Sequence, residues 1–362
     1  MPEADRAVAA AVGRAVLAPL LSAHAAAAAR WLDRVPSLHG VALRRDGTLL
    51  GLATQRLAPH LTPRLGQAWL GRQQVAAAAI DGAADHENLL NLLARMRRRP
   101  ALWGEAADML ALPPPPRPDL PLGVPSPPAF WDWLARPAID ARLRQRCDQV
   151  RRRLLAHLAA ANPATAPLML LDVGYAGTVQ RCLKRIHRLA GRPRPIHGLY
   201  LLTSPGIAWA KPGPGTIRTV LAGPERQPLA AATLLRHRDV LECLLAESAG
   251  ELLDYGDDGT PVTAPPPADD ERRRLQGHLH ASALDAVAPG ISARRARAAL
   301  LDFLLGPDAA TARLIGDWRH ADQSALDGCR RLADGPPDGD RDQTLWPAAA
   351  ALRQRAPGGG LG

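Results

Sequence analysis

The sequence predicts an α/β fold with a mostly parallel sheet, flanking helices and a helical C-terminal part. The first reason is an apolar run at residues 168–175 that ends in a turn, continues into an amphipathic segment and leads to a second apolar run at residues 196–203. Strand, helix and strand in this order predict two parallel strands joined by a right-handed crossover. The second reason is composition, because 47% of the 362 residues are hydrophobic, which is enough to fill a core.

The N-terminal elements follow from short patterns. Residues 7–34 are rich in alanine and predict a helix that Pro19 kinks or divides. The apolar run within residues 38–51 reaches charged residues and a glycine, so it predicts a strand that ends in a turn. Two helical segments are expected next, at residues 69–80 and 87–96.

The later elements are mostly helical. Apolar residues recur every three or four positions in residues 139–161 and predict an amphipathic helix. Residues 204–224, rich in Pro and Gly, are expected to form a loop, and residues 252–263 a hairpin. The chain up to residue 333 is otherwise expected to be helical, with an N-cap at Ser292 and a stop at Gly306.

Composition divides the chain into four parts. Residues 1–111 form an N-terminal α/β part, and residues 112–128, which include a run of prolines, form a linker. Residues 129–333 form the α/β core and the helical C-terminal part. The Gly, Pro and Asp content of residues 334–362 predicts a flexible tail.

The expected location is the cytoplasm. The 4 cysteines lie far apart without a CxxC pair, so buried reduced thiols are expected. The uncharged run at residues 15–29 is shorter than the roughly 20 residues that cross a bilayer, so no membrane span is expected. Acidic Glu3 and Asp5 precede it, which argues against a secretory signal.

The net charge of +10 does not by itself indicate a nucleic-acid partner. Among the 45 basic residues, only Lys184 and Lys211 are lysines, a bias typical of a GC-rich genome. Aromatic residues do not alternate with a basic patch, so nucleic acid is not expected as a partner. Binding that fell steeply with salt would indicate one.

The most informative stretch is DVGYAGTVQ, residues 172–180. Asp172 is expected at the carboxyl end of a parallel strand, where open α/β sheets bind ligands. Gly174 and Gly177 allow close approach of the backbone, and Thr178 begins a helix whose free N–H groups favour a phosphate. The pattern predicts a phosphate cradle, in which Asp172 holds sugar hydroxyls or a divalent ion. The alternative is a tight structural turn that binds nothing.

A second candidate is the sequence Arg44-Arg45-Asp46-Gly47 at the end of the earlier strand. The Arg45 guanidinium suits two-point contact with a phosphate, and Gly47 lets the backbone approach it. An ordinary turn with solvated charges is the alternative. Arg72 is a third candidate, with a plain surface arginine as the alternative.

Several chemistries are not expected. The glycine-rich turn lacks the lysine of the Walker pattern and the three-glycine spacing of dinucleotide-binding loops. His278 and His280 lie two positions apart in a helical stretch and so face different sides, and no metal ligands are predicted.

The motifs, in this order, resemble the C-terminal region of predicted haloacid-dehalogenase-superfamily proteins that occur with bacterial surface-polysaccharide glycosyltransferases. The resemblance covers about residues 15–330. It is carried by RDG at residues 45–47, GR at 71–72, DVGYAGTVQ at 172–180, GLYL at 198–201, LE at 241–242, and Tyr255, Gly259 and Pro261. Through it, Gln180 and Glu242 join the candidate site.

Departures from the family limit what the resemblance implies. The phosphatase half, with its DxDxT nucleophile motif, is absent from this chain, so phosphate hydrolysis of the dehalogenase type is not expected. The chain has GR where the family has SR, and Arg44 replaces a small or apolar residue. The two loops are also similar to the pyrophosphate and phosphoribosyl-phosphate loops of type I phosphoribosyltransferases, although only Asp172 of two adjacent acids is present. The expected fold is therefore Rossmann-like or phosphoribosyltransferase-like.

The expected function is binding of a phosphate ester, a sugar phosphate or nucleotide-sugar, in bacterial surface-polysaccharide biosynthesis, with a glycosyltransferase as the protein partner. Whether the chain is an enzyme stays open; group transfer is the expected class, and magnesium is the candidate cofactor. Asp172 and Glu242 are the expected catalytic residues. The expected binding residues are Arg45, Asp46, Gly47, Arg72, Gly174, Gly177, Thr178 and Gln180. The alternative is a non-catalytic interaction module of polysaccharide-synthesis enzymes.

Overall fold

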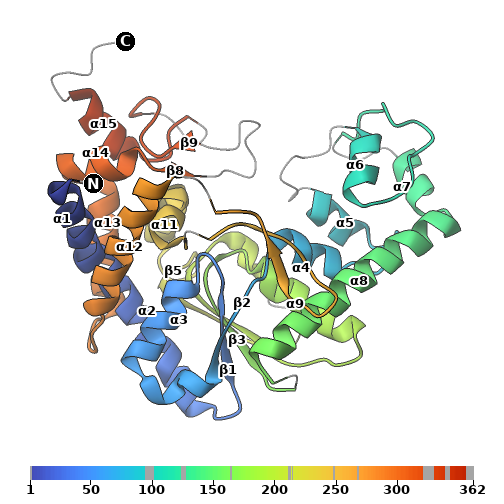
Figure 1. The fold of residues 1–362 in the computed structure, drawn as a ribbon, viewed down its shortest axis with the longest axis horizontal. Coiled ribbons are helices and arrows are strands. Elements are labelled where there is room, and N and C mark those ends of the chain that lie inside the picture. Colours follow the sequence, from blue (N-terminus) through green and yellow to red (C-terminus); the bar gives the residue numbers. More distant parts are fainter. Residues whose placement is uncertain are drawn as a thin grey trace.

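Five parallel strands form the central sheet, in the order β2-β1-β3-β4-β5 (Figure 1). They are β1 (His39–Leu43), β2 (Leu65–Ala68), β3 (Leu168–Tyr175), β4 (Ile196–Thr203) and β5 (Ile217–Ala222). The computed structural model describes residues 2–93, 102–123, 128–163, 165–210, 213, 215–247, 249–266, 269–320, 330–338 and 343–355. The predicted α/β class is confirmed, as is the parallel pairing of β3 and β4 across α9 (Thr178–Leu189).

Helices cover both faces of the sheet. Met169 and Leu171 point into one core, which also contains residues of the N-terminal and C-terminal helices. Leu168 and Leu170 alternate with them and point into the second core. The helices on the first face are α1 (Glu3–Val12), α2 (Ala18–Arg34), α3 (Thr48–Leu57), α10 (Pro228–Arg236), α11 (Arg238–Leu245), α12 (Asp270–Asp285), α13 (Ala293–Leu305), α14 (Ala309–Gly316) and α15 (Pro347–Arg355). On the second face, α9 packs with α4 (Arg72–Ala78) and α8 (Pro137–Ala161).

The N-terminal helix runs unbroken from Glu3 to Arg34, with a π-helical segment, η1 (Gly13–Leu17), before Pro19. A Cβ on Gly13 would lie 2.3 Å from the Leu279 carbonyl oxygen, so the glycine lets α12 pack closely on this segment. The run is long and apolar enough to cross a membrane by length and composition, and 61% of its most apolar window is buried inside the molecule. Packing in the first core accounts for that apolar surface.

Four short strands were not expected from the sequence. The 3-10 turn η2 (Pro59–Arg64) leads into β2, and β5 lies within the expected loop 204–224, after η3 (Pro205–Ala210). A two-stranded pair, β8 (Arg319–His320) and β9 (Arg330–Arg331), occupies a stretch expected to be helical. These expectations are wrong because β2, β8 and β9 have only two to four residues and are fixed by pairing with a partner, whereas β5 was hidden by the prolines and glycines before it. The predicted hairpin is confirmed as β6 (Leu252–Tyr255) and β7 (Pro261–Thr263).

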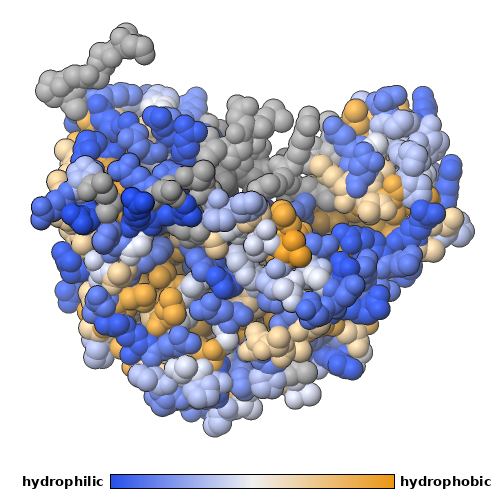
Figure 2. Space-filling model, viewed as in Figure 1, coloured by the Kyte–Doolittle hydropathy of each residue, from blue (hydrophilic) through white to orange (hydrophobic). Residues whose placement is uncertain are grey.

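A helical lobe has a core of its own. It comprises α5 (His86–Leu93), α6 (Trp103–Met109), α7 (Pro128–Leu134) and the start of α8. Leu112 and Leu122, at 7% and 5% exposure, pack into this core, so the described part of the proline-rich stretch lies against the lobe. Figure 2 shows the outline of the molecule hollowed between this lobe and the C-terminal helices.

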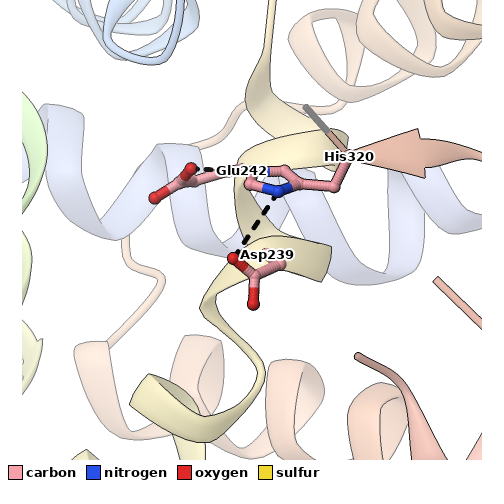
Figure 3. Close-up of side chains that lie close together, drawn as sticks. All are labelled: Asp239, Glu242 and His320. Carbon is pink, nitrogen blue, oxygen red and sulfur yellow. Dashed lines mark hydrogen bonds and ion pairs between the residues drawn. The ribbon is translucent and has the colours of Figure 1, made fainter. Parts of the chain in front are cut away.

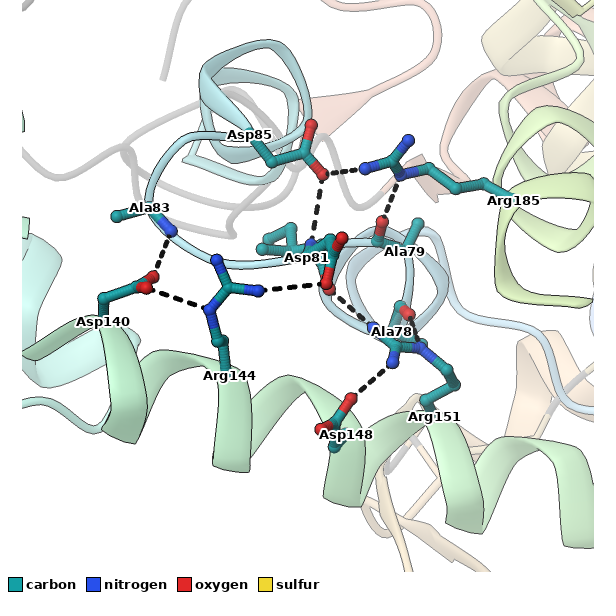
Figure 4. A network of polar contacts seen from close by, with 11 residues as sticks. Ala78, Ala79, Asp81, Ala83, Asp85, Asp140, Arg144, Asp148, Arg151 and Arg185 are labelled. Atoms are coloured by element: carbon teal, nitrogen blue, oxygen red, sulfur yellow. Dashed lines mark hydrogen bonds and ion pairs between the residues drawn. The ribbon is translucent and has the colours of Figure 1, made fainter. Parts of the chain in front are cut away.

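Ion pairs attach the lobe to the sheet through the segment between α4 and α5 (Figure 4). The Asp140 carboxylate accepts a hydrogen bond of 2.6 Å from the Ala83 N–H and pairs with Arg144 at 2.9 Å. Arg185, on α9, donates to the Ala79 carbonyl at 2.7 Å and pairs with Asp85 at 2.6 Å. The segment is therefore held from both α8 and α9.

The C-terminal segment corrects the prediction of a flexible tail for residues 343–355. Trp346 is fully buried, its ring lies 4.9 Å from that of Phe303, and its indole N–H donates to the Leu304 carbonyl at 2.9 Å. The Gly and Pro content of the surrounding residues predicted a flexible segment and gave no indication that Trp346 is buried. The expected N-cap is confirmed, because the Ser292 hydroxyl accepts from the Arg295 N–H, and α13 ends before Gly306 as expected.

Candidate functional site

The strand order creates a switch point between β1 and β3. From β1 the chain continues to β2 on one side, whereas from β3 it continues to β4 and β5 on the other. Connections that leave in opposite directions open a crevice at the carboxyl ends of the two strands, where doubly wound folds bind ligands. Asp46 follows β1 and Asp172 lies in the last part of β3.

A pocket opens at this point and gathers residues from distant stretches of sequence. It is lined by Leu43, Arg44, Arg45, Asp46, Trp69, Leu70, Gly71, Arg72, Gln73, Gln74, Asp172, Val179, Glu251 and Leu252. Arg45, Asp46, Arg72 and Asp172, four of the predicted site residues, are brought together here. The cavity volume of about 90 Å³ is well below the roughly 300–1,000 Å³ of ordinary ligand pockets, so it suits one small group of a ligand.

The turn after β1 is strained and tightly packed. Arg45 has φ of +88°, a conformation that costs a non-glycine residue about 1–3 kcal/mol and is found most often at functional sites. Its guanidinium donates to Asp46 over 3.3 and 3.4 Å, and that carboxylate raises the pKa of Arg45. A Cβ on Gly47 would lie 2.4 Å from the Leu171 carbonyl oxygen. Close packing on β3 therefore explains the glycine at position 47 without a ligand, and its expected role in ligand binding stays a prediction.

Arg44 is committed to a structural role. Glu247 accepts from two nitrogens of its guanidinium, which also lies 5.0 Å from the centre of the Trp69 ring. The Glu247 N–H donates in turn to the Arg45 carbonyl at 3.0 Å, and its carboxylate accepts from the Thr48 hydroxyl at 2.9 Å. The segment after α11 thus holds the turn that carries Arg45.

Tyr175 is a second strained residue at the same edge of the sheet. It has φ of +74°, and its hydroxyl is buried with no partner at hydrogen-bond geometry. Burial and the nearby charge of Glu242 raise the pKa of Tyr175 well above its usual value. Glu242 acts on the hydroxyl through charge and through a contact that falls short of a hydrogen bond. Strained residues of this kind cluster at functional sites, so the turn after β1 and the end of β3 are candidates for such a site.

The carboxyl group of Asp172 has a pKa close to neutral pH, so it can gain or lose a proton there. Burial is the main reason that its pKa rises to about 7, and the charge of Asp46 adds to the shift, while Arg72 opposes it. A pKa near the working pH is what general acid–base catalysis requires.

In contrast to Asp172, Glu242 has a lowered pKa. Burial on its own would raise the pKa of Glu242, but a hydrogen bond from His320 and the charge of Arg72 outweigh burial and bring the pKa to about 2. Its Oε1 lies 4.0 Å from Nη2 of Arg72. Because environments that separate two carboxyl pKa values separate their roles, Glu242 is a fixed anion. This corrects its expected role as a general base.

The glycines of the predicted cradle serve packing. Gly177 has φ of +63°, and a Cβ there would lie 2.8 Å from side-chain atoms of Ile207 and Ala210. A Cβ on Gly174 would lie 2.5 Å from the Leu202 carbonyl oxygen. Neither glycine nor Thr178 lines the pocket, to which this stretch contributes Asp172 and Val179. The expected phosphate cradle at the start of α9 is thus corrected to a packed turn.

Gln180 also proves to be structural. It is fully buried, and its amide donates to the Ile196 carbonyl at 2.8 Å and to the Thr216 carbonyl at 3.4 Å. The Tyr200 hydroxyl donates to its amide oxygen at 3.0 Å. These bonds fix α9 against β4 and replace the substrate contact that was expected.

The hairpin β6–β7 supplies a wall of the pocket that sequence reasoning missed. Gln74 donates to the Leu253 carbonyl at 2.9 Å, and the Tyr255 hydroxyl donates to the Trp69 carbonyl at 2.6 Å. Glu251, just before the hairpin, lines the pocket. The resemblance singles out Tyr255, but nothing in the local pattern indicates which segment it touches.

A second polar cluster adjoins the pocket through Glu242 (Figure 3). Asp239 and Glu242 project from α11 toward the ring of His320 on β8. Nε2 of His320 lies 3.0 Å from Oε2 of Glu242, and Nδ1 lies 3.6 Å from Oδ1 of Asp239. Each residue offers one ligand atom within 4.8 Å of the others, a spacing that is compatible with a metal ion.

Comparison with known proteins found no family model and no curated sequence that matches the chain. The function is therefore argued from the site. The side chains of Arg45 and Arg72 are 37% and 44% exposed and accessible to a ligand. Next to them is an aspartate whose pKa of about 7 allows proton transfer. This arrangement can bind an oxyanion and move a proton beside it.

Proposed function

We propose that this protein binds a phosphorylated sugar or a nucleotide-sugar through Arg45 and Arg72 at the β1–β3 switch point. The observation that carries the proposal is the meeting of two arginine side chains, 37% and 44% exposed, with Asp172 in one small pocket. Guanidiniums suit the geometry of phosphate oxygens. The cavity has room for a phosphate group, and the remainder of the ligand lies outside it, in the crevice.

Group transfer is the reaction class that the site favours. Arg45 and Arg72 would stabilise negative charge on the phosphate, the usual source of rate enhancement in such transfers. Asp172 in its charged form would accept the proton of an attacking hydroxyl, because its pKa is about 7. The role in bacterial surface-polysaccharide synthesis, with a glycosyltransferase partner in the cytoplasm, follows from the resemblance of the motifs.

Magnesium fits the donor set as a companion of the phosphate. Asp46, Asp172 and Glu251 are among the residues that line the pocket, and Mg²⁺ prefers oxygen ligands such as carboxylates. A bound ion would supply positive charge between Asp46 and Asp172, whose mutual repulsion contributes to the raised pKa of Asp172. The strand order 2-1-3-4-5 is that of flavodoxin-like doubly wound sheets, which bind ligands at the same kind of switch point as Rossmann folds.

A non-catalytic interaction module is the second candidate. The packing of Gly174, Gly177 and Gln180 favours it, because these residues need no ligand to explain them. In an interaction module the pocket would have no ligand of its own, and the site would bind no phosphate ester.

A thermal-shift experiment distinguishes the two functions. The wild type, Arg72→Ala and the surface control Arg294→Ala are heated with nucleotide-sugars, sugar phosphates and phosphoribosyl pyrophosphate, with and without magnesium. A ligand at a hundred times its Kd stabilises the folded chain by about 2.7 kcal/mol. We expect at least one ligand class to raise the Tm of the wild type and of Arg294→Ala, and to lose most of this effect in Arg72→Ala. An equal shift in Arg72→Ala, or no shift with any ligand, contradicts the proposal.

A further inference from the structure

The cluster beside the pocket places one histidine between two buried carboxylates. The side chains of Asp239, Glu242 and His320 are 2%, 11% and 14% exposed. Positions 239 and 242 lie one helical turn apart on α11 and therefore share a face. The ring of His320 lies across that face, with one nitrogen toward each acid (Figure 3).

The cluster consists of one hydrogen bond, between His320 and Glu242, and a looser contact of 3.6 Å between His320 and Asp239, and it does not form a metal cage. A metal ion needs a single ring nitrogen and both carboxylates at about 2.0–2.2 Å from one point. Here Nε2 faces Glu242 while Nδ1 faces Asp239, and these atoms lie on different edges of the imidazole. One ion cannot use both acids and the same nitrogen without reorientation of the ring.

The two oxygens of Glu242 have different partners. Oε2 accepts from Nε2 of His320 at 3.0 Å, whereas Oε1 faces Nη2 of Arg72 at 4.0 Å. A separation of 4.0 Å is a loose ion pair, and Arg72 keeps 44% of its side chain exposed. His320 therefore supplies the hydrogen bond to one oxygen of this carboxylate, while the other oxygen faces Arg72.

We propose that His320 is a positioning residue of the pocket: through its hydrogen bond to Glu242, it holds that carboxylate back so that Arg72 remains available to an anion. The inference rests on the proposed function, because it takes Arg72 to be the anion-binding group. Without His320, the buried carboxylate of Glu242 lacks its hydrogen-bond donor and closes on Arg72. The anion then has to compete with a tighter internal ion pair.

Inorganic phosphate binding, measured by calorimetry on the full chain, tests the inference through a double-mutant cycle. We expect His320→Ala to weaken phosphate binding roughly fivefold, within the range of couplings in polar networks. His320→Gln, which keeps an N–H donor, restores part of the affinity. In a Glu242→Gln background His320→Ala has no further effect, because the competing charge is gone. An equal loss in both backgrounds overturns the inference.

His280→Ala is the matched control for loosening of α11. His280, on α12, donates to the Leu244 carbonyl of α11 at 2.8 Å and makes no hydrogen bond or ion pair with Asp239 or Glu242, both of which the structure describes. We expect its removal to leave phosphate affinity unchanged. If His280→Ala weakens binding as much as His320→Ala does, His320 only supports the helix and the inference is wrong.

A measurement without phosphate separates this inference from the proposed function. Phenylglyoxal labels accessible arginines, and the rate at Arg72 is read by mass spectrometry with Arg294 as the internal standard. We expect His320→Ala to slow labelling of Arg72 and Glu242→Gln to accelerate it. If the wild type binds no phosphate, the proposed function fails while the labelling still decides the role of His320. Unchanged labelling, or a stoichiometric divalent metal that His320→Ala loses, overturns it.

Discussion

Asp172 is the residue whose environment has the largest consequence for pH dependence. Its pKa of about 7 in the folded chain compares with 3.8 for an ordinary aspartate. Between these values the unfolded chain has released a proton that the folded chain keeps. The free energy of unfolding therefore falls as the pH rises from about 4 to about 7, and this contribution is constant above and below that window.

Replacement of Asp172 by asparagine removes this dependence. We expect Asp172→Asn to be more stable than the wild type at pH 8, by up to about 4 kcal/mol, and to differ little at pH 4. Urea unfolding at the two pH values measures the difference. Asp46→Asn is the control. Loss of that neighbouring charge lowers the pKa of Asp172 in the folded chain, so the change in stability between pH 4 and pH 8 becomes smaller. The same stability difference at both pH values would show that the shift is absent.

At this scale, the sequence predicted which residues meet but not what each one does. Asp46 and Asp172 were identifiable because polar residues at the ends of parallel strands share one edge of a sheet, whereas Arg72 follows β2, a strand that was not predicted. The low pKa of Glu242 depends on His320, and the capture of Arg44 depends on Glu247. Both partners lie far away in the chain, so no local pattern could reveal them.

At the scale of elements, the turn before α9 offers a test of packing. Gly177 and Gly191 have similar φ values of +63° and +69°, but a Cβ added at Gly177 would meet neighbours within 4 Å, whereas one added at Gly191 would meet none. We expect Gly191→Ala to cost about 1 kcal/mol from backbone strain alone. Gly177→Ala adds overpacking against Ile207 and Ala210 and is expected to cost about 2–4 kcal/mol in total. Equal costs in denaturant unfolding would contradict the packed turn.

Gly177 also shows which features of these elements could not be predicted from the sequence. The order of strand, glycine turn and helix was correctly predicted for β3 and α9, because the apolar run and the amphipathic period are local. Whether a glycine admits a ligand or a neighbouring side chain depends on η3, which follows β4. β2 was missed because it is a short strand at the edge of the sheet, and β5 because prolines and glycines precede it.

For the whole molecule, the separate core of the helical lobe predicts that the lobe can unfold locally while the central sheet stays folded. Trp103 is 2% exposed, and its ring lies 5.6 Å from that of Phe130. We expect Trp103→Ala to raise amide hydrogen exchange in α6 and α7 while β1 and β3 stay protected. Leu171→Ala, in the core against the sheet, is the control and should lower protection throughout. Uniform loss of protection in Trp103→Ala would show that lobe and sheet open together.

The residues that form and support the pocket come from distant parts of the chain, so a ribosome synthesises them at different times. All strands of the central sheet have been synthesised once Ala222 is added, but the wall at Leu252 and the support from His320 come later. At about 5–20 residues per second, the stretch from β5 to β8 takes roughly 5–20 seconds to make. During that interval a nascent chain has the strands that lead to Arg45 and contain Asp172, yet it lacks Glu247, which holds the Arg45 turn, and His320, which contacts Glu242. The pocket thus takes its final form only after these later residues have been synthesised.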